Sequence, residues 1–166
     1  MNIFAYHPEP EQSALWLDDV RKNKMIVESC QLLSTAMNVL LPNHGMECYK
    51  TSYLQHPCAV WARLSYENFV WLLSYTEHLH KQRGADHKSA SLFPVFRRFA
   101  SQHHDMFPVF HRTPFVNCAR NVDMGLDFTY VENTYAAYRL YHRARWQRDT
   151  IPVTWRHGQK PKWSGL

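Results

Sequence analysis

The chain has 166 residues, of which 45% are hydrophobic and 20% are charged, and its formal net charge is +5. This length fits one domain, and the composition excludes a disordered chain because it supplies enough apolar residues for a core. No apolar run approaches the ~20 residues that cross a bilayer, and the first residues lack the basic and apolar regions of a signal peptide, so we expect a cytoplasmic protein.

Helices account for most of the predicted structure. Pro10 suits the first turn of a helix, because proline lacks only an N–H that has no partner there. Ser65 marks a break within a longer helical pattern, and Gly84 is a good C-cap for the second part of that pattern. In chain order we predict a short strand at residues 2–6 and helices over residues 9–17, 19–41, 57–83, 89–101 and 131–148. The predicted fold is therefore mainly α, a single compact helical domain that spans residues 1–166.

In two segments the apolar residues do not recur at the spacing of a helix or a strand. Residues 104–129 indicate a long ordered loop, and loops of that length in compact domains are often functional. Residues 149–166 form an extended basic tail, interrupted by Pro152, Gly158 and Pro161.

Positive charge and tryptophan concentrate in and just before this tail. Asp149 is the one acid among the basic residues, which are Arg139, Arg143, Arg145, Arg148, Arg156, Lys160 and Lys162. Trp146, Trp155 and Trp163 are interleaved with them. Because cations neutralise phosphates and aromatic rings stack on bases, this mixture favours a nucleic-acid surface. The alternative is a basic, aromatic tail that packs on the domain.

Polar side chains line one side of the helix predicted over residues 19–41. At 100° per residue they fall within an arc of roughly 80°, and they are Arg21, Lys24, Glu28, Gln31 and Thr35. An ordinary exposed face would look the same, with Lys24 and Glu28 as an ion pair of roughly 0.2–0.5 kcal/mol. Apolar residues flank the line on both sides, however, which indicates a central helix whose polar strip faces an internal cleft. A lysine and a carboxylate in such a cleft suit acid, base or nucleophile chemistry.

No metal or cofactor site is predicted. The four cysteines form no CxxC pair, and the paired histidines lack the i,i+3 or i,i+4 spacing of metal ligands on one helix face. The glycine motifs that bind phosphates or dinucleotides are missing. His56 and His87 each precede a predicted helix, where they either cap it or point into a cleft, and Lys88 adds charge to a natural anion site.

Several segments together resemble a family of small phage-borne proteins that are often labelled pyrimidine-dimer DNA glycosylases. The resemblance spans nearly the whole chain and is weakest in residues 104–129. It is carried, in order, by "NKMIVESCQLLSTA", "HPCAVWARLSYENFVWLL", "HKS", "AYRLY" and a closing "PKW". Many members of the family have a histidine where this chain has Arg21.

The resemblance implies a DNA glycosylase that flips a damaged or modified pyrimidine into a helical pocket, in the cytoplasm of an infected bacterial host. Glu28 would stabilise positive charge on the sugar or activate water, and Lys24 would supply an amine for a coupled lyase step. The best-known dimer-specific enzymes instead use an N-terminal α-amine freed by removing Met1, and Asn2 is large for that removal. The expected substrate and DNA contacts, with Trp61 or Trp71 stacking on the base, are Gln31, Arg21, His56, Trp61, Asn68, Trp71, His87, Lys88, Tyr138, Arg139, Arg143 and Arg145.

Two other functions fit the same residues. A phage base-hypermodification or nucleotide-processing enzyme would use the pocket for group transfer to a modified pyrimidine. A non-enzymatic DNA-binding or host-interference protein would depend on the basic C-terminal side chains and not on Lys24 and Glu28. Each of these functions has DNA or its nucleotides as the partner, and we expect a monomer that needs no membrane and no cofactor.

Overall fold

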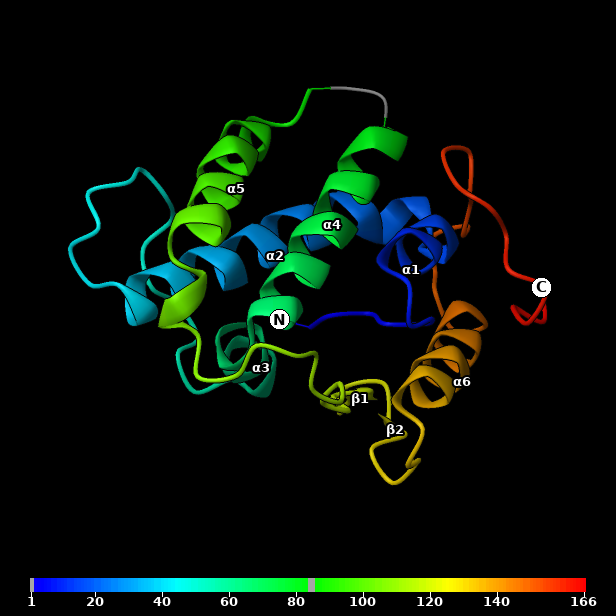
Figure 1. The fold of residues 1–166 in the computed structure, drawn as a ribbon. Coiled ribbons are helices and arrows are strands. Elements are labelled where there is room, and N and C mark those ends of the chain that lie inside the picture. Colours follow the sequence, from blue (N-terminus) through cyan, green and yellow to red (C-terminus); the bar gives the residue numbers. More distant parts are fainter. Residues whose placement is uncertain (1, 84–85) are drawn as a thin grey trace.

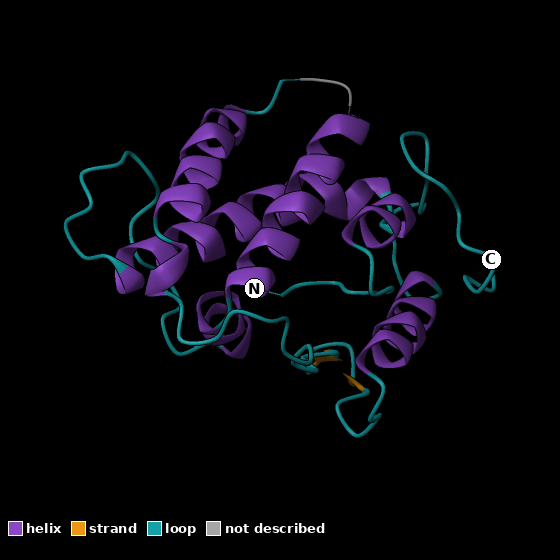
Figure 2. Cartoon of the chain, in the orientation of Figure 1, coloured by secondary structure: helices purple, strands orange, loops and turns teal. Residues whose placement is uncertain are grey.

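The computed structural model describes residues 2–83 and 86–166, and it confirms a mainly α fold (Figures 1 and 2). Within these residues the α-helices are α1 (Pro10–Trp16), α2 (Asp19–Leu40), α3 (Pro57–Leu64), α4 (Tyr66–Arg83), α5 (Phe93–Gln102) and α6 (Thr134–Trp146). Helix α2 runs through the middle of the molecule and packs against α3 and α4, while α1 packs against α4. The remaining elements are the 3-10 helices η1 (Lys88–Leu92) and η2 (His104–Met106) and the strands β1 (Arg120–Asn121) and β2 (Leu126–Asp127).

Local side chains decide where the helices begin. Asp18 caps α2 by accepting the N–H of Arg21, and His56 caps α3 by accepting the N–H of Cys58. The long pattern predicted over residues 57–83 divides at Ser65, which is extended and separates α3 from α4. The predicted C-cap Gly84 lies outside the described residues.

The short strand predicted at residues 2–6 does not form. Ile3, Phe4, Ala5 and Tyr6 are buried and extended, but they pair with no strand among the described residues. The N–H of Tyr6 donates instead to Oγ of Ser13, which satisfies a buried donor without a sheet. The prediction was wrong because a short apolar run fits any buried segment, not only a strand.

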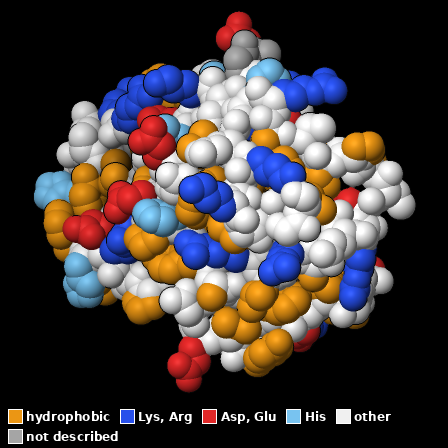
Figure 3. All heavy atoms as spheres, turned by 90° about the vertical axis from the view of Figure 1, so that its right-hand side faces the viewer, with side chains coloured by type: hydrophobic (Ala, Val, Ile, Leu, Met, Phe, Trp, Pro, Cys, Tyr) orange, Lys and Arg blue, Asp and Glu red, His pale blue; other side chains and the backbone are white. Residues whose placement is uncertain are grey.

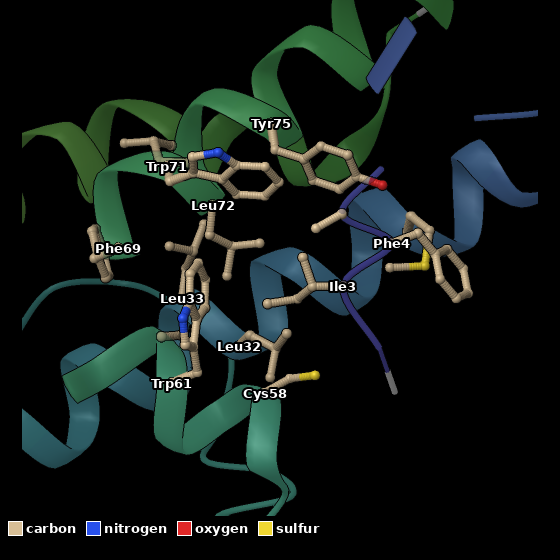
Figure 4. Packing of buried hydrophobic residues seen from close by; sticks show 14 of the residues in the cluster. Ile3, Phe4, Leu32, Leu33, Cys58, Trp61, Phe69, Trp71, Leu72 and Tyr75 are labelled. Atoms are coloured by element: carbon tan, nitrogen blue, oxygen red, sulfur yellow. The ribbon is translucent and has the colours of Figure 1, made fainter. Parts of the chain in front are cut away.

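The core lies where α2, α3 and α4 meet (Figure 4). The Trp61 and Trp71 rings meet edge to face with their centroids 6.1 Å apart, and Phe115 stacks on Trp61 at 4.3 Å. Both indoles also donate a hydrogen bond, from Trp61 to the carbonyl of Thr113 and from Trp71 to that of Pro8. These two tryptophans therefore fix α3 and α4 to the segments that cross them.

The segment predicted as a loop over residues 104–129 contains η2 and a small antiparallel hairpin. Arg120 pairs with Asp127 and Asn121 with Leu126, and the turn between the strands includes Gly125 at φ +62°. Glycine suits this left-handed conformation, which side chains disfavour.

The basic tail lies on α1 and α2 and has no regular secondary structure within the described residues. The N–H of Asp19 donates to the carbonyl of Thr154, and the N–H of Gln159 donates to that of Leu15. The interleaved tryptophans pack on each other, since the Trp146 and Trp163 rings stack with centroids 5.4 Å apart. No described helix is long and apolar enough to cross a membrane.

Candidate functional site

A pocket of about 180 Å³ opens beside the N-terminal half of α2. Four parts of the chain line it: the N-terminal segment with Asn2 and Phe4, α2 with Arg21, Lys24, Met25 and Glu28, β1 with Arg120 and Asn121, and α6 with Tyr141 and Arg145. Four of these side chains are cations and one is a carboxylate. The pocket therefore favours a ligand that carries negative charge. Close to that charge, the ligand should have an electron-poor atom that the carboxylate can contact.

Glu28 is the only carboxylate among the described residues that line this pocket. Its side chain is 14% exposed, and one carboxylate oxygen accepts the backbone N–H of Asn2 at 3.1 Å. Lys24 Nζ lies 3.6 Å from the other oxygen and is 74% exposed, so it stands at the rim. The carboxylate is therefore held in place on the protein side and paired with a hydrated cation on the solvent side.

Asn2 is fixed by contacts behind the pocket. Its side-chain Nδ2 donates to the carbonyl of Cys118 at 3.0 Å, and its Oδ1 accepts the hydroxyl of Tyr138. Tyr138 is fully buried, and its hydroxyl oxygen also accepts the N–H of Cys118. Tyr138 thus supports the residue that contacts Glu28 and does not reach the pocket itself.

Arg21 forms part of the pocket wall but is almost completely buried, at 6% exposed. It pairs with Asp18, at 3.0 Å, and with Asp149 in the tail. Burial opposes the charged guanidinium, but the two carboxylates outweigh that effect and raise the pKa of Arg21. Arg21 is therefore a permanent buried cation beneath the pocket.

A second pocket, of about 220 Å³, adjoins the first and shares Arg21, Lys24 and Arg145 with it. Its other walls include the exposed side chains of Val20 and Ile151. The two pockets therefore share a basic wall, and the second adds these apolar side chains and the carboxylate of Asp149. Seen from the side of α6 and the tail, Lys and Arg side chains are spread over the surface, with hydrophobic side chains exposed below them (Figure 3).

Glu28 lies close enough to His56 to influence the pKa of the imidazole ring. Burial lowers the pKa of His56, while Glu28 acts in the opposite direction and favours the charged ring. Since Nδ1 accepts the N–H of Cys58, the neutral ring carries its proton on Nε2. His56 therefore serves as a helix cap that stands near the site.

The other predicted site residues lie away from the pocket. Trp61 and Trp71, expected to stack on a base, have their rings in the core, and the Asn68 amide bonds to the carbonyl of Trp61 and to Thr113. His87 caps η1, and Lys88 is exposed on that element. The cap is one of the two roles expected for His87, whereas Trp61, Trp71 and Asn68 lie in the core and do not line the pocket.

Further predicted contacts have mixed positions. Gln31 lies on the polar side of α2 but is half-buried and does not line the pocket. Arg139 donates from Nε to the carbonyl of Tyr6 and lies over the Trp16 ring. Arg143 is exposed, beside Gly165 in the tail. Of the predicted residues, the structure brings together at the pocket Arg21, Lys24, Glu28 and Arg145.

Sequence reasoning missed Asn2, Arg120, Asn121 and Tyr141. The only signal for Arg120 and Asn121 was their place in a long segment that lacked a period but had to be ordered. Asn2 gave no signal, since its contact with Glu28 crosses 26 positions of the sequence.

No cluster of three or more metal-ligating side chains occurs in the part of the chain that the structure describes. Comparisons with protein-family models, with curated protein sequences and with solved structures find no significant match to this chain.

Proposed function

We propose that the protein is a DNA N-glycosylase that removes a damaged or modified pyrimidine, with Glu28 as its catalytic carboxylate. The observation that carries this proposal is a fixed, mostly buried carboxylate in a pocket whose other charged side chains are all cations. Cleavage of an N-glycosidic bond develops positive charge on the deoxyribose, and a preorganised carboxylate stabilises that charge. Arg120, Arg145 and Lys24 would contact the phosphates on either side of the sugar.

The size of the pocket favours a single extruded nucleotide. At about 180 Å³ it has no room for a base pair, so the target nucleotide would have to leave the stack. In the simplest reaction, Glu28 accepts a proton from a water molecule as that water attacks C1′. The C1′–N1 bond breaks, and the base departs with its electron pair.

A lyase-coupled reaction would replace the water by an amine. Lys24 is one candidate, since its Nζ lies 3.6 Å from a Glu28 oxygen. The backbone nitrogen of Asn2 lies closer, at 3.1 Å, and it would become an amine if the peptide bond before it were cleaved. Either amine would form a Schiff base at C1′ after the base departs.

The test is incubation with duplexes that carry uracil, 5-hydroxymethyluracil or a thymine dimer, with abasic sites as the measured product. Loss of a catalytic carboxylate removes roughly 10²–10⁴-fold of rate, so Glu28→Gln should reduce product formation by at least about 100-fold. Glu47→Gln, at an exposed loop position, is the matched control and should keep full activity.

Wild-type protein that yields no abasic site from any of the three duplexes would overturn the proposal. A gain of mass on the target base, in place of base release, would instead identify a group-transfer enzyme. Borohydride reduction during the reaction traps a Schiff base, and peptide mapping of the adduct then separates Lys24 from residue 2.

A further inference from the structure

The hairpin beside the pocket presents a large apolar side chain to solvent. Strand β1 contributes Arg120 and Asn121 to the pocket lining, and Val122 follows them at the start of the turn. The Val122 side chain is 70% exposed and does not line either of the two adjoining pockets. A singly exposed valine is ordinary on a protein surface, and Val122 is distinguished by its place directly after two residues that line the pocket.

The turn that carries Val122 is held in one shape. The N–H of Gly125 donates to the carbonyl of Val122 at 2.9 Å, and the N–H of Met124 donates to Oδ1 of Asn121 at 3.1 Å. Arg148, beyond the end of α6, donates to the carbonyl of Met124. Val122 is therefore presented on a braced turn whose position is set relative to both β1 and α6.

Arg120 and Arg148 stand beside this turn, which also carries Asp123, and Asp127 pairs opposite Arg120 in the hairpin. Arg120 is exposed and lines the pocket, and Arg148 is exposed on the α6 side. Phosphate contacts from two such cations would hold a DNA strand across the turn. An apolar side chain between them would then face the base stack.

We propose that Val122 enters the duplex beside the extruded nucleotide and occupies the space that its base leaves. This inference rests on the proposed function. Extruding a nucleotide breaks stacking and pairing, and apolar side chains inserted between base steps are a common means of stabilising the unstacked duplex. The protein would accordingly prefer duplex DNA and would lose that preference without Val122.

Ile151 is a competing side chain, because it is 60% exposed and lies close to Lys24 and Arg145. It lines the second pocket together with Val20, however, so it forms part of a concave wall. A side chain in a concave wall can contact a ligand group that enters the pocket, but it is not placed to insert into the base stack of a duplex.

The experiment uses a duplex with one 5-hydroxymethyluracil and 2-aminopurine as its 3′ neighbour, since 2-aminopurine fluorescence rises when the base unstacks. Wild-type protein should raise the fluorescence, and Val122→Ser should remove most of the rise. Because no charge changes, the salt dependence of binding should stay the same. Val39→Ser, at an exposed position near the far end of α2, should behave as wild type, and Ile151→Ser tests the competing side chain.

No rise with wild-type protein, or an equal rise with Val122→Ser, would overturn the inference. Loss of the rise only in Ile151→Ser would overturn it as well. Base release is measured separately: Val122→Ser should lower it roughly 10- to 100-fold on duplex and leave it unchanged on a single strand. Wild-type protein that unstacks the duplex but releases no base would refute the glycosylase and leave the role of Val122 standing.

Discussion

Asp18 is the residue whose truncation we expect to destabilise the fold most, because three interactions converge on its fully buried carboxylate. One oxygen accepts the N–H of Arg21 as the N-cap of α2, and the Arg21 guanidinium lies 3.0 Å from the same oxygen. The other oxygen accepts Nε1–H of Trp146, at the end of α6, at 3.0 Å. Asp18 thus joins α2 to α6 directly beneath the pocket.

The magnitude for Asp18→Ala follows from these three contacts. Loss of the N-cap costs about 1 kcal/mol, and a buried indole N–H without an acceptor costs about 1–3 kcal/mol. Breaking a buried ion pair costs about 3–5 kcal/mol, and less here because Arg21 keeps Asp149. Allowing for overlap among these contributions, we expect a loss of about 4–6 kcal/mol, against a typical domain stability of about 5–15 kcal/mol.

Urea unfolding followed by tryptophan fluorescence measures this loss. Asp18→Asn keeps one acceptor oxygen, which can serve either the cap or the Trp146 indole but not both, so it should lose less than Asp18→Ala and remain measurable even where Asp18→Ala does not fold. Glu47→Ala, at an exposed position, should stay within about 0.5 kcal/mol of wild type. A loss below about 2 kcal/mol for Asp18→Ala, or equal losses for the alanine and asparagine variants, would refute the reasoning.

Two further predictions concern titrating groups. Burial, together with nearby arginines, lowers the pKa of His142 well below its usual 6.5. Below pH 6.5, His142 therefore binds a proton in the unfolded chain but stays neutral in the folded protein. The free energy of unfolding should therefore fall with decreasing pH, by up to about 1.4 kcal/mol per unit, and His142→Gln should flatten the slope; an unchanged slope would contradict this. A hydrogen bond from Cys58 lowers the pKa of the Cys118 thiol, whereas burial raises that of Cys30 to about 12. Iodoacetamide at pH 8 should consequently label Cys118 before Cys30 by peptide mass, and the reverse order would count against the thiolate.

The helices were predictable because their signals are local. Asp18 and His56 cap the helices that follow them, and Pro57 stands in the first turn of α3. Such signals act over three or four residues and need no tertiary partner. The N-terminal segment had no signal of this kind, and its extended shape depends on Ser13 and on packing against α6.

The candidate site was predictable only where it lies on one helix. The spacing of Lys24 and Glu28 places both on the polar side of α2, and both line the pocket. Trp61 and Trp71 show the limit of the same method, since an aromatic ring at helical spacing suits a core and a base-stacking wall equally well. The structure places both rings in the core, and only long-range packing determines that.

The pocket also changes how Lys24 is interpreted. Lysines that form Schiff bases are desolvated in apolar pockets or stand next to other cations that disfavour their charge. Lys24 is 74% exposed and pairs with Glu28, so it is not desolvated, and its position suits contact with a phosphate. The backbone nitrogen of Asn2, in contrast, lies on the inner side of Glu28 in a residue fixed by Tyr138 and the Cys118 carbonyl. The exposure of Lys24 therefore argues against a Schiff base at this residue, and in the proposed reaction Lys24 would pair with Glu28 and contact the DNA backbone. Residue 2 would supply an amine only if Met1 were removed, which the size of Asn2 disfavours.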